Sequence, residues 1–314
     1  MEHHYGTIGR NDMAKIKRNK INHHTLEEAM DSFLTNVKEK GLSETTYATY
    51  KQNVLIFMEA FPDLTVEQIN DDTLKEFRHW LSNHRNFNSV SINTTYRTIN
   101  IFFTFLHDEY HIKHYKLEYV KEVRKIKKGF TDDEIRLITK KPDLLTCHYS
   151  EYRDFIITIL ALNTGVRVGS LAQVKVSDID FKAKTIYFSH MKNSKPQIFP
   201  LNRYLLKELK EYINVCDLKT YLFENSLHKQ ATSKQLSVSF RRYCLARGCK
   251  TTSIHQLRAK FASKLIQDTG DVFLVMRALN HSNPNVTMRY LQSIGINDYT
   301  DKLEDFNILD KLKG

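Results

Sequence analysis

The sequence predicts a mainly α-helical protein of two domains with one small β-hairpin. Only 10 Gly and 5 Pro interrupt the chain, and apolar residues recur at three- and four-residue spacing through most of it. A length of 314 residues exceeds the roughly 100 to 200 residues of one domain. Hydrophobic residues make up 41% of the chain, which excludes disordered and fibrous proteins.

Four helices are expected in the N-terminal part of the chain. The first begins with a capping box, in which Thr25 and Glu28 satisfy each other's backbone N–H groups, and the fourth carries the longest apolar stripe. The preceding residues, 1–24, are predicted to be a flexible extension, and 25–112 a compact helical domain. The expected helices span residues 25–41, 43–60, 72–82 and 89–110.

A basic segment, 113–128, is predicted to link the two domains. It contains seven Lys or Arg and has little helical periodicity. Such a charge run is equally consistent with a solvated surface and with a segment that neutralises DNA phosphates. Both interpretations remain open from the sequence.

The second predicted domain, 129–314, begins with another capping box, formed by Thr131 and Glu134. An apolar helix, 151–162, stops at Asn163-Thr164-Gly165, and a short helix follows. The only convincing strand pattern then forms a hairpin, 185–189 with 197–201, around a polar bend. Further helices are expected at 202–215, 233–247, 255–268 and 271–279.

The charge of the chain favours a polyanionic partner. The formal net charge is +11, from 47 Lys and Arg against 36 Asp and Glu. No apolar run approaches the length of a transmembrane helix, and the first 24 residues lack a secretory signal, so we expect a cytoplasmic protein with no membrane partner. The four cysteines form no CxxC pair, and we expect neither a metal site nor disulfides.

Cationic side chains and a phenol are the chemistry that the second domain offers. Phosphate loops, HExxH and GxSxG motifs, and acidic clusters spaced for magnesium are all missing from the sequence. His255 and Arg258 are three residues apart on one helix and therefore share a face. Two arginines can hold the oxygens of one phosphate in forked hydrogen bonds, and a tyrosine is then an available nucleophile.

Five motifs in order resemble the tyrosine recombinase, or phage integrase, family. They are Thr164-Gly165-Val166-Arg167, Lys192 with Phe199-Pro200-Leu201, His255-Gln256-Leu257-Arg258, Leu279-Asn280-His281, and Tyr290 nine residues further on. The resemblance covers the chain from about residue 128, and the first domain is similar to the SAM-like core-binding domain that precedes it in that family. It implies a mixed α+β catalytic domain.

The resemblance also implies a role for each catalytic candidate. Arg167 and Arg258 would clamp the scissile phosphate, Tyr290 would attack it, and His281 would donate a further hydrogen bond. Lys192 would protonate the leaving 5′ oxygen, and His255 would accept the phenol proton. The expected reaction is DNA cleavage and rejoining through a 3′-phosphotyrosine, in integration, excision, resolution or inversion, without metal, ATP or another cofactor.

Three positions depart from the family pattern. Ser170 stands where an acidic residue is usual, Ala259 where His is frequent, and Asn280 where Gly is usual. We expect activity to be retained, with Ser170 altering the balance between cleavage and religation.

Double-stranded DNA with inverted-repeat core sites is the expected partner. The resemblance implies a homotetramer in the synaptic complex and a monomer in solution, with an apolar C-terminal tail that either docks on its own domain or is exchanged between protomers. The predicted DNA contacts are Asn93, Thr94, Arg97, Lys125, Lys127, Lys128, Lys234, Arg241 and Arg242.

Two other functions compete with recombination. A type IB topoisomerase forms the same covalent intermediate but religates the same strand, and sequence preference distinguishes the two enzymes. A catalytically silent DNA-binding regulator is the alternative from another class. The presence of all six candidate catalytic residues argues against it.

Overall fold

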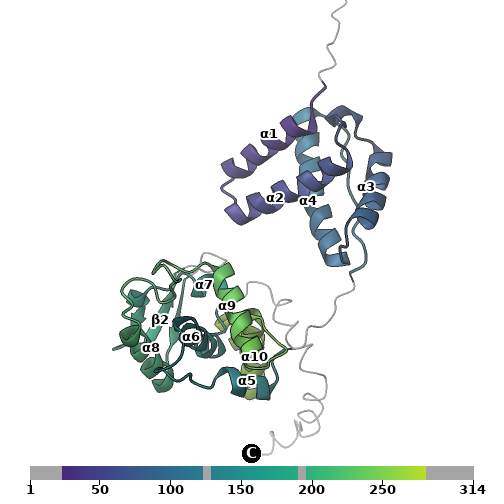
Figure 1. Cartoon of the computed structure of the whole chain (residues 1–314). Helices are drawn as coiled ribbons and strands as arrows, with labels where there is room; N and C mark the ends of the chain where they lie inside the picture. The colour runs from purple at the N-terminus through teal and green to yellow at the C-terminus, as the bar shows by residue number, and fades with distance from the viewer. Residues whose placement is uncertain (1–22, 123–128, 190–195, 281–314) are drawn as a thin grey trace, which may run out of the picture. The chain divides into compact units, whose positions relative to one another are not determined.

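The computed structural model describes residues 23–122, 129–189 and 196–280 (Figure 1). The chain divides into two compact units, residues 1–125 and 126–314. The predicted N-terminal extension lies outside the described residues apart from its last two. No helix in the described ranges combines the length and the apolar character that crossing a bilayer requires.

The first unit contains the four predicted helices, which the structure confirms. The Thr25 side chain accepts a hydrogen bond from the Glu28 N–H, and the Glu28 carboxylate accepts one from the Thr25 N–H, so the capping box forms as expected. The elements are α1 (Leu26–Glu39), α2 (Glu44–Ala60), the 3-10 helix η1 (Val66–Gln68), α3 (Asp71–His84) and α4 (Ser89–Tyr110).

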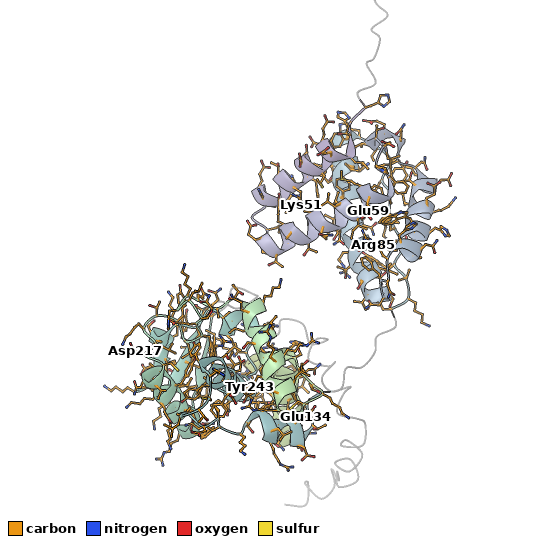
Figure 2. All side chains as sticks on the ribbon, in the orientation of Figure 1. Lys51, Glu59, Arg85, Glu134, Asp217 and Tyr243 are labelled. Carbon is orange, nitrogen blue, oxygen red and sulfur yellow. The ribbon has the colours of Figure 1, made fainter. Side chains whose placement is uncertain are left out.

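Aromatic rings fill the core of this unit. The Phe57 ring centroid lies 5.0 Å from that of Phe77 and 5.5 Å from that of Phe103, both in edge-to-face geometry. At the rim, Arg85 forms an ion pair with Glu59 of α2 (Figure 2). The apolar periodicity read from the sequence therefore gives the correct buried faces.

The prediction that the interdomain linker begins at residue 113 is wrong. Tyr115 and Leu117 are 8% and 0% exposed and belong to the core of the first unit. Residues 113–122 therefore extend the first domain beyond the predicted boundary at 112. The rest of the predicted linker, 123–128, lies outside the described residues.

The second unit surrounds a buried helix with other helices and a small sheet. Its helices are α5 (Asp132–Ile138), α6 (Tyr149–Thr164), α7 (Val168–Leu171), η2 (Val176–Asp178), α8 (Arg203–Val215), α9 (Ser233–Ala246), α10 (Ile254–Thr269) and α11 (Val272–Ala278). Helix α6 packs against α8, α9 and α10 (Figure 1), which explains why its apolar residues occupy more than one face.

Among the described residues, the sheet has three antiparallel strands in the order β1 (Ile179–Asp180), β2 (Thr185–Phe188), β3 (Gln197–Pro200). The predicted hairpin is confirmed by the pairing of β2 with β3, with Ile186 opposite Phe199. Strand β1 was not predicted, because a pair of residues is too short to show the alternation that identifies a strand.

Candidate active site

A tight turn after α6 positions the first catalytic candidate. Gly165 ends the helix in a left-handed conformation, with φ of 61°. A Cβ atom here would lie 2.3 Å from Phe261 Cδ1 and 2.8 Å from Leu279 Cδ2, so the turn has room only for glycine. Arg167 follows two residues later as the N-cap residue of α7.

Arg258 is held by the ends of two helices. Its side chain is buried, and Nη1 donates to the carbonyl oxygen of Gly165 at 2.5 Å while Nη2 donates to that of Leu279 at 2.7 Å. Gly165 and Leu279 are the C-cap residues of α6 and α11. Their carbonyl groups therefore lie where the helix dipole concentrates partial negative charge. The planar guanidinium of Arg258 is thus fixed in position and orientation.

Three predicted catalytic residues line one cavity of about 360 Å³. Arg167 and Arg258 contribute guanidinium groups and His255 an imidazole, as the three-residue spacing on α10 predicts. The other described lining residues are Val166, Val168, Gly169 and Ser170. No acidic side chain of the described residues lines this cavity, so its potential favours an anion.

The predicted catalytic lysine lies outside the described residues, but the strands that flank it are described. Strands β2 and β3 pair on either side of the segment that contains Lys192. At the start of β3, Gln197 Nε2 donates to the carbonyl oxygens of Arg277 and Ala278, at 3.2 and 3.1 Å. The next carbonyl in the chain, that of Leu279, is one of the two that hold Arg258.

His281 and Tyr290 also lie outside the described residues. The residue before His281, Asn280, has a φ of 49°, in the left-handed region. Glycine adopts this conformation without steric cost, and asparagine tolerates it better than most residues. The departure from the family pattern at this position therefore preserves the backbone conformation.

Ser170, the first departure from the family pattern, lines the same cavity as the two arginines. Its side chain is buried, and its N–H donates to the carbonyl oxygen of Arg167 at 2.9 Å. The serine thus occupies the wall of the cavity that contains Arg167 and Arg258. Ala259, the third departure, follows Arg258 on α10 and is half-buried.

The predicted DNA contacts have different surroundings. Thr94 and Arg97 are exposed on α4, and Lys234, Arg241 and Arg242 are exposed on α9. Asn93 does not share this exposure, because its side chain is 3% exposed and its amide bonds to the backbone of Val120. Lys125, Lys127 and Lys128 lie outside the described residues.

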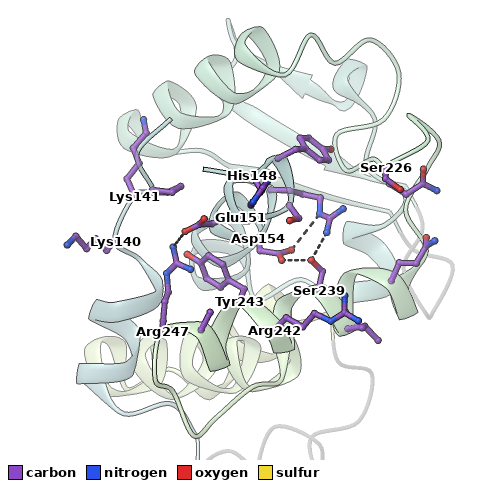
Figure 3. A pocket seen from close by; sticks show the side chains of 18 of the residues that line it. Lys140, Lys141, His148, Glu151, Asp154, Ser226, Ser239, Arg242, Tyr243 and Arg247 are labelled. Carbon is purple, nitrogen blue, oxygen red and sulfur yellow. Dashed lines mark hydrogen bonds and ion pairs between the residues drawn. The ribbon is translucent and has the colours of Figure 1, made fainter. Parts of the chain in front are cut away.

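A second, larger cavity of about 1690 Å³ lies between the start of α6 and α9 (Figure 3). Lys234 and Arg242 line it, but none of the predicted catalytic residues does. Several of its charges are already matched. Arg247 pairs with Glu151 at 2.6 Å, and Lys141 pairs with Glu208 and Glu211 at 2.7 and 2.8 Å.

A buried polar network forms the wall of this larger cavity. Ser239 Oγ donates to Asp154 Oδ2 at 2.5 Å, and Arg153 Nη2 donates to Ser239 Oγ at 2.7 Å (Figure 3). Burial raises the pKa of Asp154 to about 6, although Arg153 and Ser239 partly offset the effect. The network joins the start of α6 to the middle of α9.

Sequence analysis missed this network. Its partners are separated by 85 or 86 residues, and no periodicity relates them. One signal was available, since Arg153 and Asp154 are adjacent charges in an apolar helix, where charges are rare unless paired.

Two arginines and a histidine around one cavity define a site for an oxyanion such as a phosphodiester. Planar guanidinium groups match phosphate oxygens, and the low polarity of the surrounding core strengthens their attraction for charge. Within the described ranges, no group of three or more His, Cys, Asp or Glu is arranged to hold a metal. The cations that line this cavity are those of a candidate phosphate-binding site.

Comparison with known families identifies the chain more closely. The phage integrase family model matches residues 128–294, and that of the phage integrase N-terminal SAM-like domain matches 29–112. The chain belongs to the phage integrase family, the tyrosine recombinases, which are enzymes of DNA strand exchange. The family and fold predicted from the motifs are confirmed.

Relatives and solved structures agree with this assignment. The chain is 26% identical to the tyrosine recombinase XerA of Pyrococcus furiosus over 91% of this chain and 96% of that protein, and 26% identical to XerC of Staphylococcus aureus over 84% and 92%. A Tn1549 transposon integrase bound to transposon right-end DNA has the same fold, with a TM-score of 0.73 and 16% identity over 89% of this chain and 98% of that one. A lambda integrase tetramer bound to a Holliday junction also has this fold, with a TM-score of 0.69. Its sequence is 19% identical, over 86% of this chain and 78% of that one.

Proposed function

We propose that the chain recombines DNA at specific sites through a covalent 3′-phosphotyrosine, with Tyr290 as the nucleophile. The supporting observation is the series of contacts that brings together the elements of the motifs. Arg258 contacts Gly165 and Leu279, and Gln197 contacts Ala278. Each contact joins a segment that contains, or directly adjoins, a predicted catalytic residue.

Arg167 and Arg258 hold the nonbridging oxygens of the scissile phosphate. As the Tyr290 oxygen attacks phosphorus, negative charge grows on these oxygens, and cations already in place stabilise it. His255 accepts the phenol proton, Lys192 gives a proton to the leaving 5′ oxygen, and His281 donates a hydrogen bond to the phosphate. One phosphoester bond forms as another breaks, so a second 5′ hydroxyl can reverse the reaction on a new strand.

The proposed partner is double-stranded DNA with inverted-repeat core sites. The exposed cations of α9 and the polar face of α4 lie on different units, and together they offer two DNA-contacting surfaces. Synapsis of two duplexes takes four copies of the chain, and the apolar residues after Asn297 are proposed to link the protomers. The setting is integration, excision, resolution or inversion of a DNA element in the cytoplasm.

Covalent capture tests this function. The full chain is incubated without metal with a library of nicked duplexes, and adducts that survive detergent are sequenced. Adducts at one inverted-repeat sequence, absent with Tyr290→Phe although that variant still binds DNA, are the expected result. Adducts scattered over sequence would instead indicate a topoisomerase, and binding without adducts a regulator.

A further inference from the structure

The chain that follows α4 turns back and runs along that helix. The Asn100 side chain donates to the carbonyl oxygen of Leu117 at 3.0 Å and accepts from its N–H at 2.7 Å. Asn93 forms the same pair of bonds with Val120, both at 2.9 Å. Because the earlier asparagine contacts the later residue, the segment 113–122 lies antiparallel to α4, and we name it the strap.

The spacing of the two asparagines matches that of the residues they hold. Asn93 and Asn100 are two helical turns apart, about 10.5 Å along the axis. Leu117 and Val120 are three residues apart, which is about 10 Å in an extended chain. An asparagine amide can donate through its nitrogen and accept through its oxygen, so each side chain satisfies both backbone groups of its partner, as a neighbouring strand would.

Apolar contacts hold the strap in the same place. Leu117 is fully buried, and the Tyr115 ring lies 6.2 Å from that of Phe103 in edge-to-face geometry. His114 also contacts the Thr104 hydroxyl, at 3.3 Å. The strap is therefore fixed to α4 along most of its length by both polar and apolar contacts.

Attachment of the strap shortens the chain that connects the two units. With the strap in place, the connection is residues 123–128, which can span at most about 20 Å when extended. With the strap released, the connection would be 113–128, with a maximum span of about 55 Å. Attachment of the strap also moves the site at which the chain leaves the first unit, from the end of α4 to a point beside Asn93.

We propose that Asn93 and Asn100 are positioning residues that set the length of the connection between two DNA-binding units. A short connection raises the local concentration of one unit at the DNA once the other has bound, and this concentration falls roughly as the −3/2 power of connection length. The inference rests on the proposed function, because both units must contact the same duplex.

The variant Asn93→Ala/Asn100→Ala tests the inference in the full chain. Each substitution leaves the N–H and C=O of a strap residue without their asparagine partner, which favours release of the strap into water. Hydrogen exchange at 113–122 should become fast. Affinity for a random-sequence duplex of about three helical turns should fall about fourfold, as expected for sixteen connecting residues instead of six.

A matched control separates connection length from damage to the first unit. Wild-type chain with about ten Gly and Ser residues inserted after Lys125 keeps the strap but lengthens the connection. It should lose affinity to the same extent, with unchanged hydrogen exchange at 113–122 and an unchanged Tm.

Three outcomes would overturn the inference. The first is fast exchange in the double variant with wild-type affinity, and the second is an insertion that leaves affinity unchanged. If the wild-type chain binds DNA, either result contradicts the proposed role of the strap and leaves the proposed function standing. A wild-type chain that does not bind the duplex at all overturns the proposed function together with this inference.

Discussion

The smaller and the larger cavity described in the second unit differ in how their charges are held. In the smaller one, Arg258 is fixed by backbone carbonyls and no described lining residue is acidic. In the larger one, cations such as Arg153 and Arg247 contact carboxylates of the same protein. A cation held by neutral carbonyls keeps its attraction for an incoming phosphate, whereas a matched cation mainly stabilises the fold. Charge balance therefore favours the smaller cavity as the candidate active site, although it is not the larger of the two.

The largest expected effect follows from changing how an arginine is held. Arg258→Lys keeps the positive charge but loses the planar fork that contacts both Gly165 and Leu279. The rate of adduct formation should fall about 10²- to 10³-fold, as for loss of one preorganised donor. Single-turnover cleavage of a nicked duplex measures this rate, and gel-shift affinity should change little.

Arg242→Lys is the matched control for Arg258→Lys in the larger cavity. This side chain is exposed on α9 and lines the cavity without predicted catalytic residues. It should affect DNA affinity more than the rate of cleavage. Equal losses of cleavage rate in both variants would contradict the distinction between the two cavities.

Gly165→Ala should lower the stability of the protein by disturbing the turn that holds Arg258 beside the smaller cavity. The added Cβ would lie 2.3 Å from Phe261 Cδ1, and the left-handed φ adds strain, so we expect a loss of about 3 kcal/mol in the free energy of unfolding. Gly41→Ala controls for the strain alone, because Gly41 also has positive φ but nothing within 4 Å of the added atom. A loss of about 1 kcal/mol is expected there. Urea unfolding measures both, and equal losses would contradict the crowding at Gly165.

Asp154, in the wall of the larger cavity, should make the stability of the protein depend on pH. Burial raises its pKa from 3.8 to about 6, so between these values the folded chain retains a proton that the unfolded chain has lost. The free energy of unfolding should therefore fall as pH rises through this window, by about 3 kcal/mol in total. Asp154→Asn should remove this dependence, as urea unfolding at several pH values would show.

Glu134 provides a comparison of opposite sign. Burial alone would raise the pKa of this carboxyl, but N–H groups of Thr251, Thr131 and Lys250 donate to it and lower the pKa overall. Its contribution to stability should therefore be present at neutral pH and lost as pH falls. A Glu134→Gln variant that changed the pH profile in the same direction as Asp154→Asn would contradict both assignments.

The smallest effect is expected at Ser170. Ser170→Glu restores a carboxylate to the wall of the smaller cavity, beside Arg167 and Arg258. A carboxylate there would orient the arginines but weaken their net charge, so the ratio of cleavage to religation should change, by less than the effect of Arg258→Lys on cleavage. Separate measurement of the two rates on nicked substrates tests this. Unchanged rates would show that Ser170 does not support the pocket.

The sequence by itself predicted the elements and the chemistry of this protein. Capping boxes at Thr25 and Thr131 and the apolar stripe of α4 are local signals, because they depend on residues within one or two helical turns. The spacing of His255 and Arg258 is equally local, and it correctly predicted a shared pocket. The order of the five motifs was sufficient to identify the family.

The tertiary structure alone decided what holds these elements in place. Asn93 looked like a DNA contact because it is polar and near Arg97, yet it is buried against a strap 27 residues away. The carbonyls that fix Arg258, from Gly165 and Leu279, are 93 and 21 residues distant. Backbone groups are the same at every residue, so the sequence carries no mark of which carbonyl a distant side chain will meet, and only the packing of the helices selects it.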